Sequence, residues 1–199
     1  TVLNRVMQNR FAIFGLVVVV LLLFTALFAP LIAPYNPTKQ NYDALKEPPS
    51  MDHPFGTDTY GRDVFSRVVF GSRYAVFLGV VIVGIEMLIG VTLGLVAGYS
   101  GGWTEAAIMR LVDVSLSIPA IVLALAIAAM LGGGLFPLIV AVSLVGWRGF
   151  TRLVRGDVKS VMEEEYIESA NAAGLSDFRI IIRYVLPNVA SSIIVYATL

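Results

Sequence analysis

The 199-residue sequence contains no cysteine and a single histidine, His53. Without cysteine, disulfide frameworks, thiolate metal sites and cysteine nucleophiles are excluded. Charge is scarce as well, because only 14% of the residues are charged, and 14 basic and 14 acidic side chains cancel to a formal net charge of zero. Overall charge therefore gives no reason to expect a nucleic-acid partner. A Gly-x-x-x-x-Gly-Lys-Ser/Thr loop is also absent, so P-loop binding of ATP is not expected.

What the sequence has instead is a series of long apolar runs. Hydrophobic residues make up 57% of the chain, and its mean hydropathy is +0.82, well above that of an average soluble domain. The first run begins at Phe11 and extends for about 22 residues, enough to cross a hydrocarbon core of about 30 Å. It exceeds the roughly 7–15 residues of a signal-peptide core. The sequence therefore predicts an all-α integral membrane protein, because a helix satisfies its backbone groups within lipid.

Four further apolar runs predict spans two to five, and Pro119 is expected to kink the third of them. The predicted spans run from about Tyr74 to Gly98, from about Ala106 to Leu131, from Leu135 to Phe150, and from near Leu186 onward. The last run is too short to cross a membrane as it stands. Since the sequence starts with Thr1 and ends inside this run, we expect it to be part of a longer polypeptide.

The runs divide the chain into three parts. Residues 1–34 form a tail and the first span, residues 35–73 an external segment, and residues 74–199 a multi-span domain with a polar loop at about 160–185. Arg5 and Arg10 precede the first span, and six basic residues lie between positions 148 and 183. By the positive-inside rule, the N-terminus and the polar loop are expected in the cytoplasm.

The external segment is rich in proline and is expected to be largely irregular. It contains a compact motif, which consists of Gly56, Thr57, Asp58, Gly61, Arg62 and Asp63. Turn capping by the two aspartates is favoured over metal binding, because no further ligands accompany them. Apolar residues at helical spacing from Val64 to Val69 predict a short amphipathic helix that lies flat on the outer surface.

Small and charged residues mark the predicted spans. Glycines at positions 90, 94 and 98 share one helix face, which predicts close packing against a neighbouring helix. Glu86 lies near mid-membrane, where it could belong to a substrate route or form a structural hydrogen bond. Arg110 and Asp113 are three residues apart and are expected to form a structural ion pair.

The fourth span continues into a basic stripe. The stripe consists of Arg148, Arg152, Arg155 and Lys159, at helical spacing. We interpret it as a cytoplasmic marker whose cations meet lipid headgroups, in preference to a phosphate-recognition site.

The polar island from Glu163 to Asn188 predicts two short helices. Glutamates at 163–165 suit a helix start, and Gly174 suits a helix end. Ser176 or Asp177 can cap a second helix, which Pro187 is expected to interrupt. Small residues at the turn between the helices leave the backbone accessible, which suggests a docking surface.

At this island the chain resembles the permease subunits of ATP-binding-cassette importers. Their cytoplasmic loop has Glu-Ala-Ala, a later Gly and a Leu-Pro pair, matched here by Glu168-Ser169-Ala170, Gly174 and Leu186-Pro187, with Ser169 in place of the first Ala. The resemblance implies a type I importer permease fold with a coupling-helix loop that docks on an ATPase. It also implies that the rest of span five and a sixth span follow in the full polypeptide. The implied docking residues are Glu168, Ser169, Ala170, Ala172, Ala173, Gly174, Leu175 and Asp177.

The external motif is similar to that of the dipeptide, oligopeptide and nickel branch of these permeases. The resemblance implies half of a peptide-translocation path in a prokaryotic cytoplasmic membrane, with nickel or another small solute as the alternative cargo. Implied partners are a homologous second permease, two ATPase subunits that bind ATP and Mg, an extracytoplasmic binding protein and membrane lipid. No cofactor, resident metal or enzymatic activity is expected in this chain.

Two other classes remain as alternatives. An ion-gradient-driven secondary transporter would be expected to show inverted repeats and several polar groups at mid-membrane, where this chain offers Glu86. An intramembrane enzyme would need a catalytic constellation within the spans, and Asp113 has no second carboxylate beside it in sequence. Transport by the isolated chain without any ATPase would argue against the importer.

Overall fold

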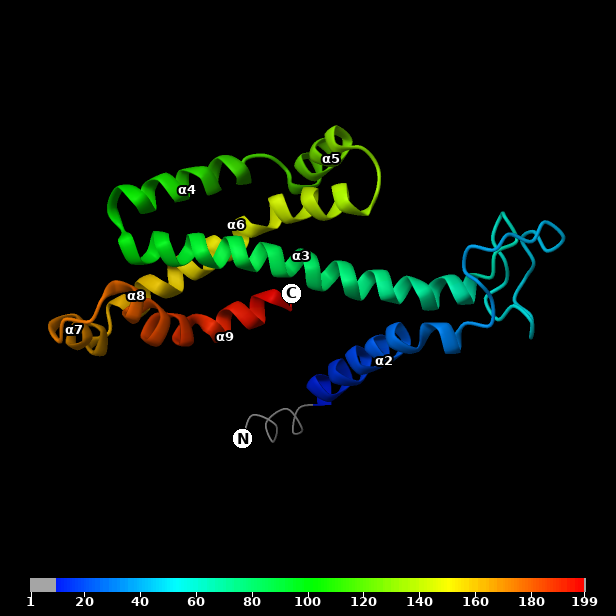
Figure 1. The fold of residues 1–199 in the computed structure, drawn as a ribbon, viewed down its shortest axis with the longest axis horizontal. Helices are drawn as coiled ribbons and strands as arrows, with labels where there is room; N and C mark the ends of the chain where they lie inside the picture. Colours follow the sequence, from blue (N-terminus) through cyan, green and yellow to red (C-terminus); the bar gives the residue numbers. More distant parts are fainter. Residues whose placement is uncertain (1–9, 199) are drawn as a thin grey trace. The chain divides into compact units, whose positions relative to one another are not determined.

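The computed structural model describes residues 10–198. Arg5 and Leu199 lie outside the described residues, so the structure does not bear on their predicted roles. Within 10–198 the chain forms helices and loops, and the one β-bridge there joins Thr57 to Asp63. The all-α prediction is confirmed. Two compact units make up the chain, Thr1–Gly79 and Val80–Leu199, and Figure 1 gives the succession of their helices.

The first unit contains the first membrane-length helix, α2 (Arg10–Ile32). Its 23 residues match the predicted first span, and Pro30 lies in its last turn. The backbone of 33–63 is then irregular up to the start of α3 (Val64–Ser100).

The predicted separate amphipathic helix is wrong. Val64 instead opens α3, which continues for 37 residues without interruption, so the expected boundary at residue 73 falls inside a helix. The stretch from Val64 to Tyr74 contains no proline, and a single glycine at position 71 costs a helix only about 1 kcal/mol. The apolar stripe therefore belongs to the first turns of α3.

The second unit contains the end of α3 and the third predicted span, which is broken into two helices. These are α4 (Gly102–Leu116) and α5 (Ala120–Leu131), and their axes differ by 87°. Pro119, between them, has an extended backbone with φ −54° and ψ 131°. Because proline lacks an N–H and its ring clashes with the preceding turn, the predicted kink becomes a full break.

The fourth span and its basic extension form one helix, α6 (Leu135–Met162), as predicted. Beyond it come two short helices, α7 (Glu165–Ala172) and α8 (Asp177–Ile180). Figure 1 shows them at the end of this unit where α3 turns into α4.

The predicted interruption at Pro187 is wrong. A π-helical turn, η1 (Ile181–Val185), joins α8 to α9 (Leu186–Ala197), and the three form one 21-residue stretch long enough to span. At the end of the π turn the Leu186 N–H bonds to the Ile181 carbonyl five residues back. This wider turn accommodates the proline, and the Asn188 side-chain amide donates to the Tyr184 carbonyl at 2.6 Å. The fifth span therefore starts at residue 177 and not near Leu186.

Within residues 10–198, four helical stretches can cross a membrane by length and composition, and five can if the bent α4–α5 pair counts as one span. The core of the second unit lies between α6 and the C-terminal helices. It is built from Phe150, Val154, Val158, Ile167, Ala170, Ile180, Val185, Val189 and Ile193.

The predicted glycine face of α3 packs against α6. A Cβ placed on Gly94 or on Gly98 would come within 2.7 Å of the Cβ of Val154 or Val158, respectively, and one on Gly90 would collide with Phe150. Because the small residues of α3 meet the branched residues of α6 at the same four-residue interval, the two backbones approach closely.

Candidate functional site

The loop between α6 and the fifth span has a well-defined turn. Gly174 has φ +75°, a conformation that favours glycine. Its N–H bonds to the Asn171 carbonyl at 2.9 Å, and the Leu175 N–H bonds to the Ala170 carbonyl at 3.2 Å. This pair of bonds is the Schellman motif, which ends a helix and satisfies its last carbonyls. The predicted helix end at Gly174 is confirmed.

One side of α7 anchors the loop to the rest of the second unit. Ile167 and Ala170 are buried in the core with Val154 and Val158 of α6 and Ile180 of α8. The burial of Ala170 corrects the prediction that it belongs to the docking surface. Ala170 lies two residues before the end of α7, and its methyl group points inward with Ile167, which precedes it by about one turn.

The other side of α7 is exposed. Three of the predicted docking residues lie there, namely Glu168, Ser169 and Ala172. Ala173 and Gly174, just beyond the end of α7, are exposed as well. Leu175 is half-buried and packs against the core, while Asp177 is exposed. The loop thus presents acidic side chains among small residues on a base that is tied to α6, which is a shape suited to enter a cleft on another protein.

Tyr99, at the end of α3, connects that helix to the loop. Its hydroxyl donates a 2.8 Å hydrogen bond to Asp177 Oδ1, across 78 residues of sequence. The sequence does not predict this contact, because a tyrosine beside a glycine-rich turn does not specify a partner.

Acidic residues of α4 pair with the basic stripe of α6. Arg155 Nε lies 2.7 Å and Lys159 Nζ 3.1 Å from Glu105 Oε1. Arg152 Nη2 lies 2.7 Å from Asp113 Oδ1. The predicted Arg110–Asp113 pair is therefore wrong, because α6 supplies the cation from across the helix interface.

The stripe is accordingly an interhelical ladder and not a row of free headgroup contacts. Its innermost member, Arg148, is buried and donates to the Ser115 carbonyl and, at 3.3 Å, to the Ser115 hydroxyl. In a continuous helix that carbonyl would accept the N–H of residue 119, which is a proline here. Arg148 thus satisfies the carbonyl group that the break in the third span leaves open.

Glu86 lines a small cavity of about 260 Å³ between α3, α6 and α9. Its carboxyl group lies against Gly146, where a Cβ would collide with it. Phe150 and Tyr196, which meet edge to face with centroids 4.8 Å apart, also line this cavity. Among residues 10–198, Glu86 has no hydrogen-bond partner, so the structural hydrogen bond considered for it is not found there.

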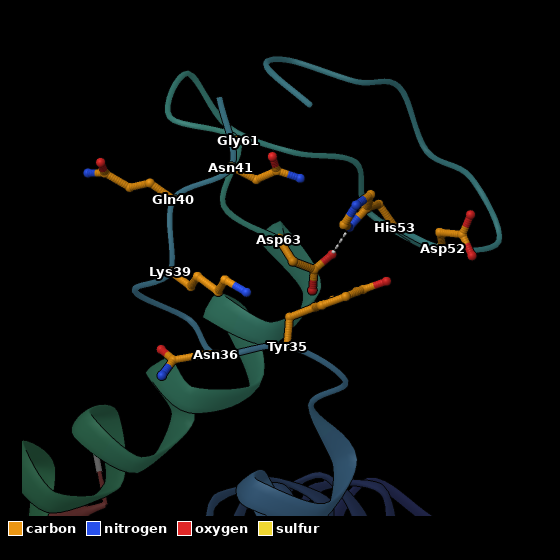
Figure 2. A pocket seen from close by; sticks show the side chains of 9 residues that line it. All are labelled: Tyr35, Asn36, Lys39, Gln40, Asn41, Asp52, His53, Gly61 and Asp63. Carbon is orange, nitrogen blue, oxygen red and sulfur yellow. Dashed lines mark hydrogen bonds and ion pairs between the residues drawn. The ribbon is translucent and has the colours of Figure 1, made fainter. Parts of the chain in front are cut away.

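In the first unit, Asp63 occupies the start of α3. Its Oδ2 accepts the Ser66 N–H at 2.7 Å, which is the N-cap arrangement, and its Oδ1 lies 3.0 Å from His53 Nδ1. Figure 2 shows this pair above the ring of Tyr35, with Lys39 directed toward the same hollow of about 430 Å³. His53 is therefore a structural partner of the motif.

Asp58 holds the turn that precedes Asp63. Its Oδ1 accepts the N–H groups of Tyr60 at 2.8 Å and Arg62 at 3.1 Å, and its Oδ2 pairs with Arg62 Nε at 2.7 Å. The expected turn-capping by both aspartates is thus what the structure has. The motif glycines fit tightly, because a Cβ on Gly56 or Gly61 would collide with the backbone of residues 41–47.

The same contacts govern the ionisation of both carboxyl groups. Burial on its own raises the pKa of Asp63, but hydrogen bonds from Ser66 and His53 outweigh it and hold that pKa below its ordinary value. For Asp58, hydrogen bonds from Tyr60 and Arg62 likewise outweigh burial and lower the pKa. Both groups are therefore stabilised as carboxylates, which is the form that caps turns.

Two family models match this sequence. The model for binding-protein-dependent transport system inner membrane components matches residues 90–199, which include α6, the exposed loop and the fifth span. The model for the N-terminal TM domain of oligopeptide transport permease C matches residues 1–49.

Curated proteins of similar sequence are bacterial permeases. A dipeptide transport system permease protein of Alkalihalophilus pseudofirmus is 41% identical over 98% of this chain and 64% of its own length. An oligopeptide transport system permease protein of Bacillus subtilis is 35% identical over 98% and 64%. A glutathione transport system permease protein of Pectobacterium atrosepticum is 40% identical over 97% and 64%. The chain thus spans about 64% of the length of these relatives.

Proposed function

This chain belongs to the family of binding-protein-dependent transport system inner membrane components, and from that premise we propose that it forms half of the path of an ATP-driven peptide importer. It is an integral inner-membrane protein. The relatives named above carry dipeptides, oligopeptides or glutathione, itself a short peptide, according to their names. Peptide is therefore the favoured cargo over nickel or another small solute.

The observation that carries the proposal is the two-sided α7 loop. Its inner side is locked into the core through Ile167 and Ala170, and its outer side exposes Glu168 beside small residues. A partner that pushes on the outer side would move α7 and α6 together, because packed cores transmit displacement instead of deforming continuously. We assign the outer side to an ATPase subunit.

In this scheme two ATPase subunits bind ATP and Mg, a second permease completes the path, and an extracytoplasmic binding protein delivers the peptide. The Tyr99–Asp177 hydrogen bond offers a second link, from the loop to α3. This chain would change the access of the path by rigid-body motion of its helices and would carry out no covalent chemistry.

Substitutions on the outer side of α7 test ATPase docking. Ala172→Arg adds bulk at an exposed helical position without straining the Gly174 turn, and Glu168→Lys inverts the charge of an acidic side chain on that surface. Each should lower co-purification of the ATPase subunits about 10-fold or more, since a disrupted hot spot costs about 2 kcal/mol or more. Uptake of labelled dipeptide by whole cells should fall in parallel.

The matched control is Glu163→Lys, which makes the same charge change at an exposed residue before α7 begins. It should leave both readouts close to wild type. Equal ATPase recovery in Glu168→Lys, Ala172→Arg and the control would contradict the assignment of this surface.

A further inference from the structure

Arg179 and Arg183, in the first turns of the fifth span, differ from the cations of α6. The guanidinium and ammonium groups of the α6 ladder have acceptors in Glu105, Asp113 and Ser115. For Arg179 and Arg183, residues 10–198 provide no hydrogen-bond acceptor and no acidic partner, and both side chains are exposed. Two neighbouring positive charges are thus available to a ligand from outside this chain.

The two arginines line one groove of about 620 Å³. The groove is formed by Ser176, Phe178, Arg179, Ile182, Arg183 and Pro187. Phe178 is 75% exposed and Ile182 is 47% exposed. The groove therefore combines two guanidinium groups with exposed apolar side chains.

The groove lies where a polar loop becomes a membrane span. All but one of its lining residues, Ser176, belong to Asp177–Ala197, a stretch apolar and long enough to cross. A span that starts beside a polar loop passes the headgroup layer in its first turns, where arginine meets phosphate and apolar side chains meet acyl chains. The ligand that matches this groove is amphiphilic and anionic.

We infer that this groove binds one anionic phospholipid, with its phosphate held by Arg179 and Arg183 and its first acyl carbons against Phe178 and Ile182. Guanidinium groups suit this role because they bind phosphate oxygens in a bidentate geometry. The site is distinct from the outer side of α7, which carries Glu168 and exposes no arginine. A soluble ATPase at the groove would have to displace lipid from a membrane-spanning stretch, which favours the lipid as occupant.

The test measures lipid retained by the assembled permease complex. The complex is purified from nanodiscs that contain equal amounts of phosphatidylglycerol and phosphatidylcholine, and bound lipids are counted by native mass spectrometry. Arg179→Gln and Arg183→Gln should each reduce retained phosphatidylglycerol about fivefold, the usual effect of one basic residue at an anionic surface. Phosphatidylcholine should not change.

The matched control is Arg110→Gln, which removes an exposed arginine of α4 that has no ion-pair partner among residues 10–198. It should retain phosphatidylglycerol at the wild-type level. Arg179→Lys keeps the charge but not the bidentate geometry, so it should lose less phosphatidylglycerol than Arg179→Gln. It also shows whether the position tolerates substitution. A 10 mM excess of inorganic phosphate should not displace the lipid, because it cannot pack against the exposed apolar side chains.

Three results would overturn the inference. They are unchanged phosphatidylglycerol in both glutamine variants, an equal loss in Arg110→Gln, and displacement by inorganic phosphate. Loss of ATPase subunits with unchanged lipid would overturn it too and would assign the groove to a protein. Since the readout is lipid and not transport, a different cargo for the complex would leave the result intact.

Discussion

At the scale of single residues, Asp63 is a buried carboxylate that makes several contacts in the first unit. Its side chain is 1% exposed, and it caps α3 through the Ser66 N–H while it meets His53. The Ser66 hydroxyl in turn accepts the Tyr35 N–H at 3.2 Å, which ties the end of the first span to the same point. One buried carboxylate thus organises the start of α3 and the chain that leads to it.

We expect Asp63→Ala to destabilise this segment by about 1–2 kcal/mol, because it removes an N-cap and leaves buried donors unpaired. Hydrogen–deuterium exchange of the amides in residues 53–67 measures the opening directly. Asp52→Ala, at an exposed aspartate of the same loop, is the control and should exchange like wild type. Equal protection in the two variants would contradict the role given to Asp63.

The same carboxylate predicts a pH dependence. The pKa of Asp63 is lowered in the folded state, so its stabilising effect is present above the ordinary aspartate pKa of about 3.9 and is lost as the pH falls through the lower folded value. Protection of the Ser66 amide should therefore stay level from pH 7 to about pH 4 and decrease below that. Asp63→Asn should weaken this decrease. If the Ser66 amide loses protection at low pH in Asp63→Asn as it does in wild type, the Asp63 carboxylate is not the cause.

At the scale of elements, the α3–α6 interface and the α4–α6 ladder show how one helix organises the second unit. On one side of α6, Phe150, Val154 and Val158 pack into the glycine face of α3. Elsewhere on the same helix, Arg152 and Arg155 hold the acidic residues of α4. Apolar packing therefore stabilises the α3–α6 interface, and ion pairs stabilise the α4–α6 interface.

The glycine interface predicts a sharp difference between two equivalent substitutions in α3. Gly94→Ala should destabilise the chain by about 1–3 kcal/mol, because a methyl group there meets Val154 and the core must shift. Gly84→Ala should be neutral or slightly stabilising, since nothing lies within 4 Å of its Cβ and alanine favours helix. Thermal unfolding of both variants in detergent measures the difference. A Gly94→Ala protein as stable as Gly84→Ala would exclude the tight α3–α6 contact.

At the scale of the whole molecule, membrane orientation follows from the distribution of basic residues. Six of them lie between positions 148 and 183, and the proline-rich segment of the first unit carries both signs of charge. Most of the ladder cations are paired, yet they still count for orientation, because the rule depends on Lys and Arg and not on net charge. We therefore propose that the α7 loop lies in the cytoplasm and that residues 35–63 lie outside.

Lysine labelling tests this orientation cleanly, because the sequence has only three lysines, Lys39, Lys46 and Lys159. An impermeant amine reagent added to intact cells should modify Lys39 and Lys46, and it should reach Lys159 only after lysis. Peptide mapping by mass spectrometry locates the labels. Modification of Lys159 in sealed cells, with Lys39 protected, would reverse the topology.

The sequence by itself determined the class of this protein, most of its spans and the position of its loop. Long apolar runs leave helices as the local solution in lipid, Gly174 ends α7 because it reaches positive φ cheaply, and glycines at a four-residue interval lie on one helix face whatever their partner. Periodicity and backbone preference are local properties, so they can be read without a structure.

Only the tertiary structure decided which groups meet. Asp113 pairs with Arg152 and not with Arg110, Tyr99 reaches Asp177, and Ala170 turns inward. The structure also showed that the fifth span starts at residue 177, because a π turn accommodates Pro187. Pairing depends on which helices pack side by side, and sequence spacing describes only one helix at a time.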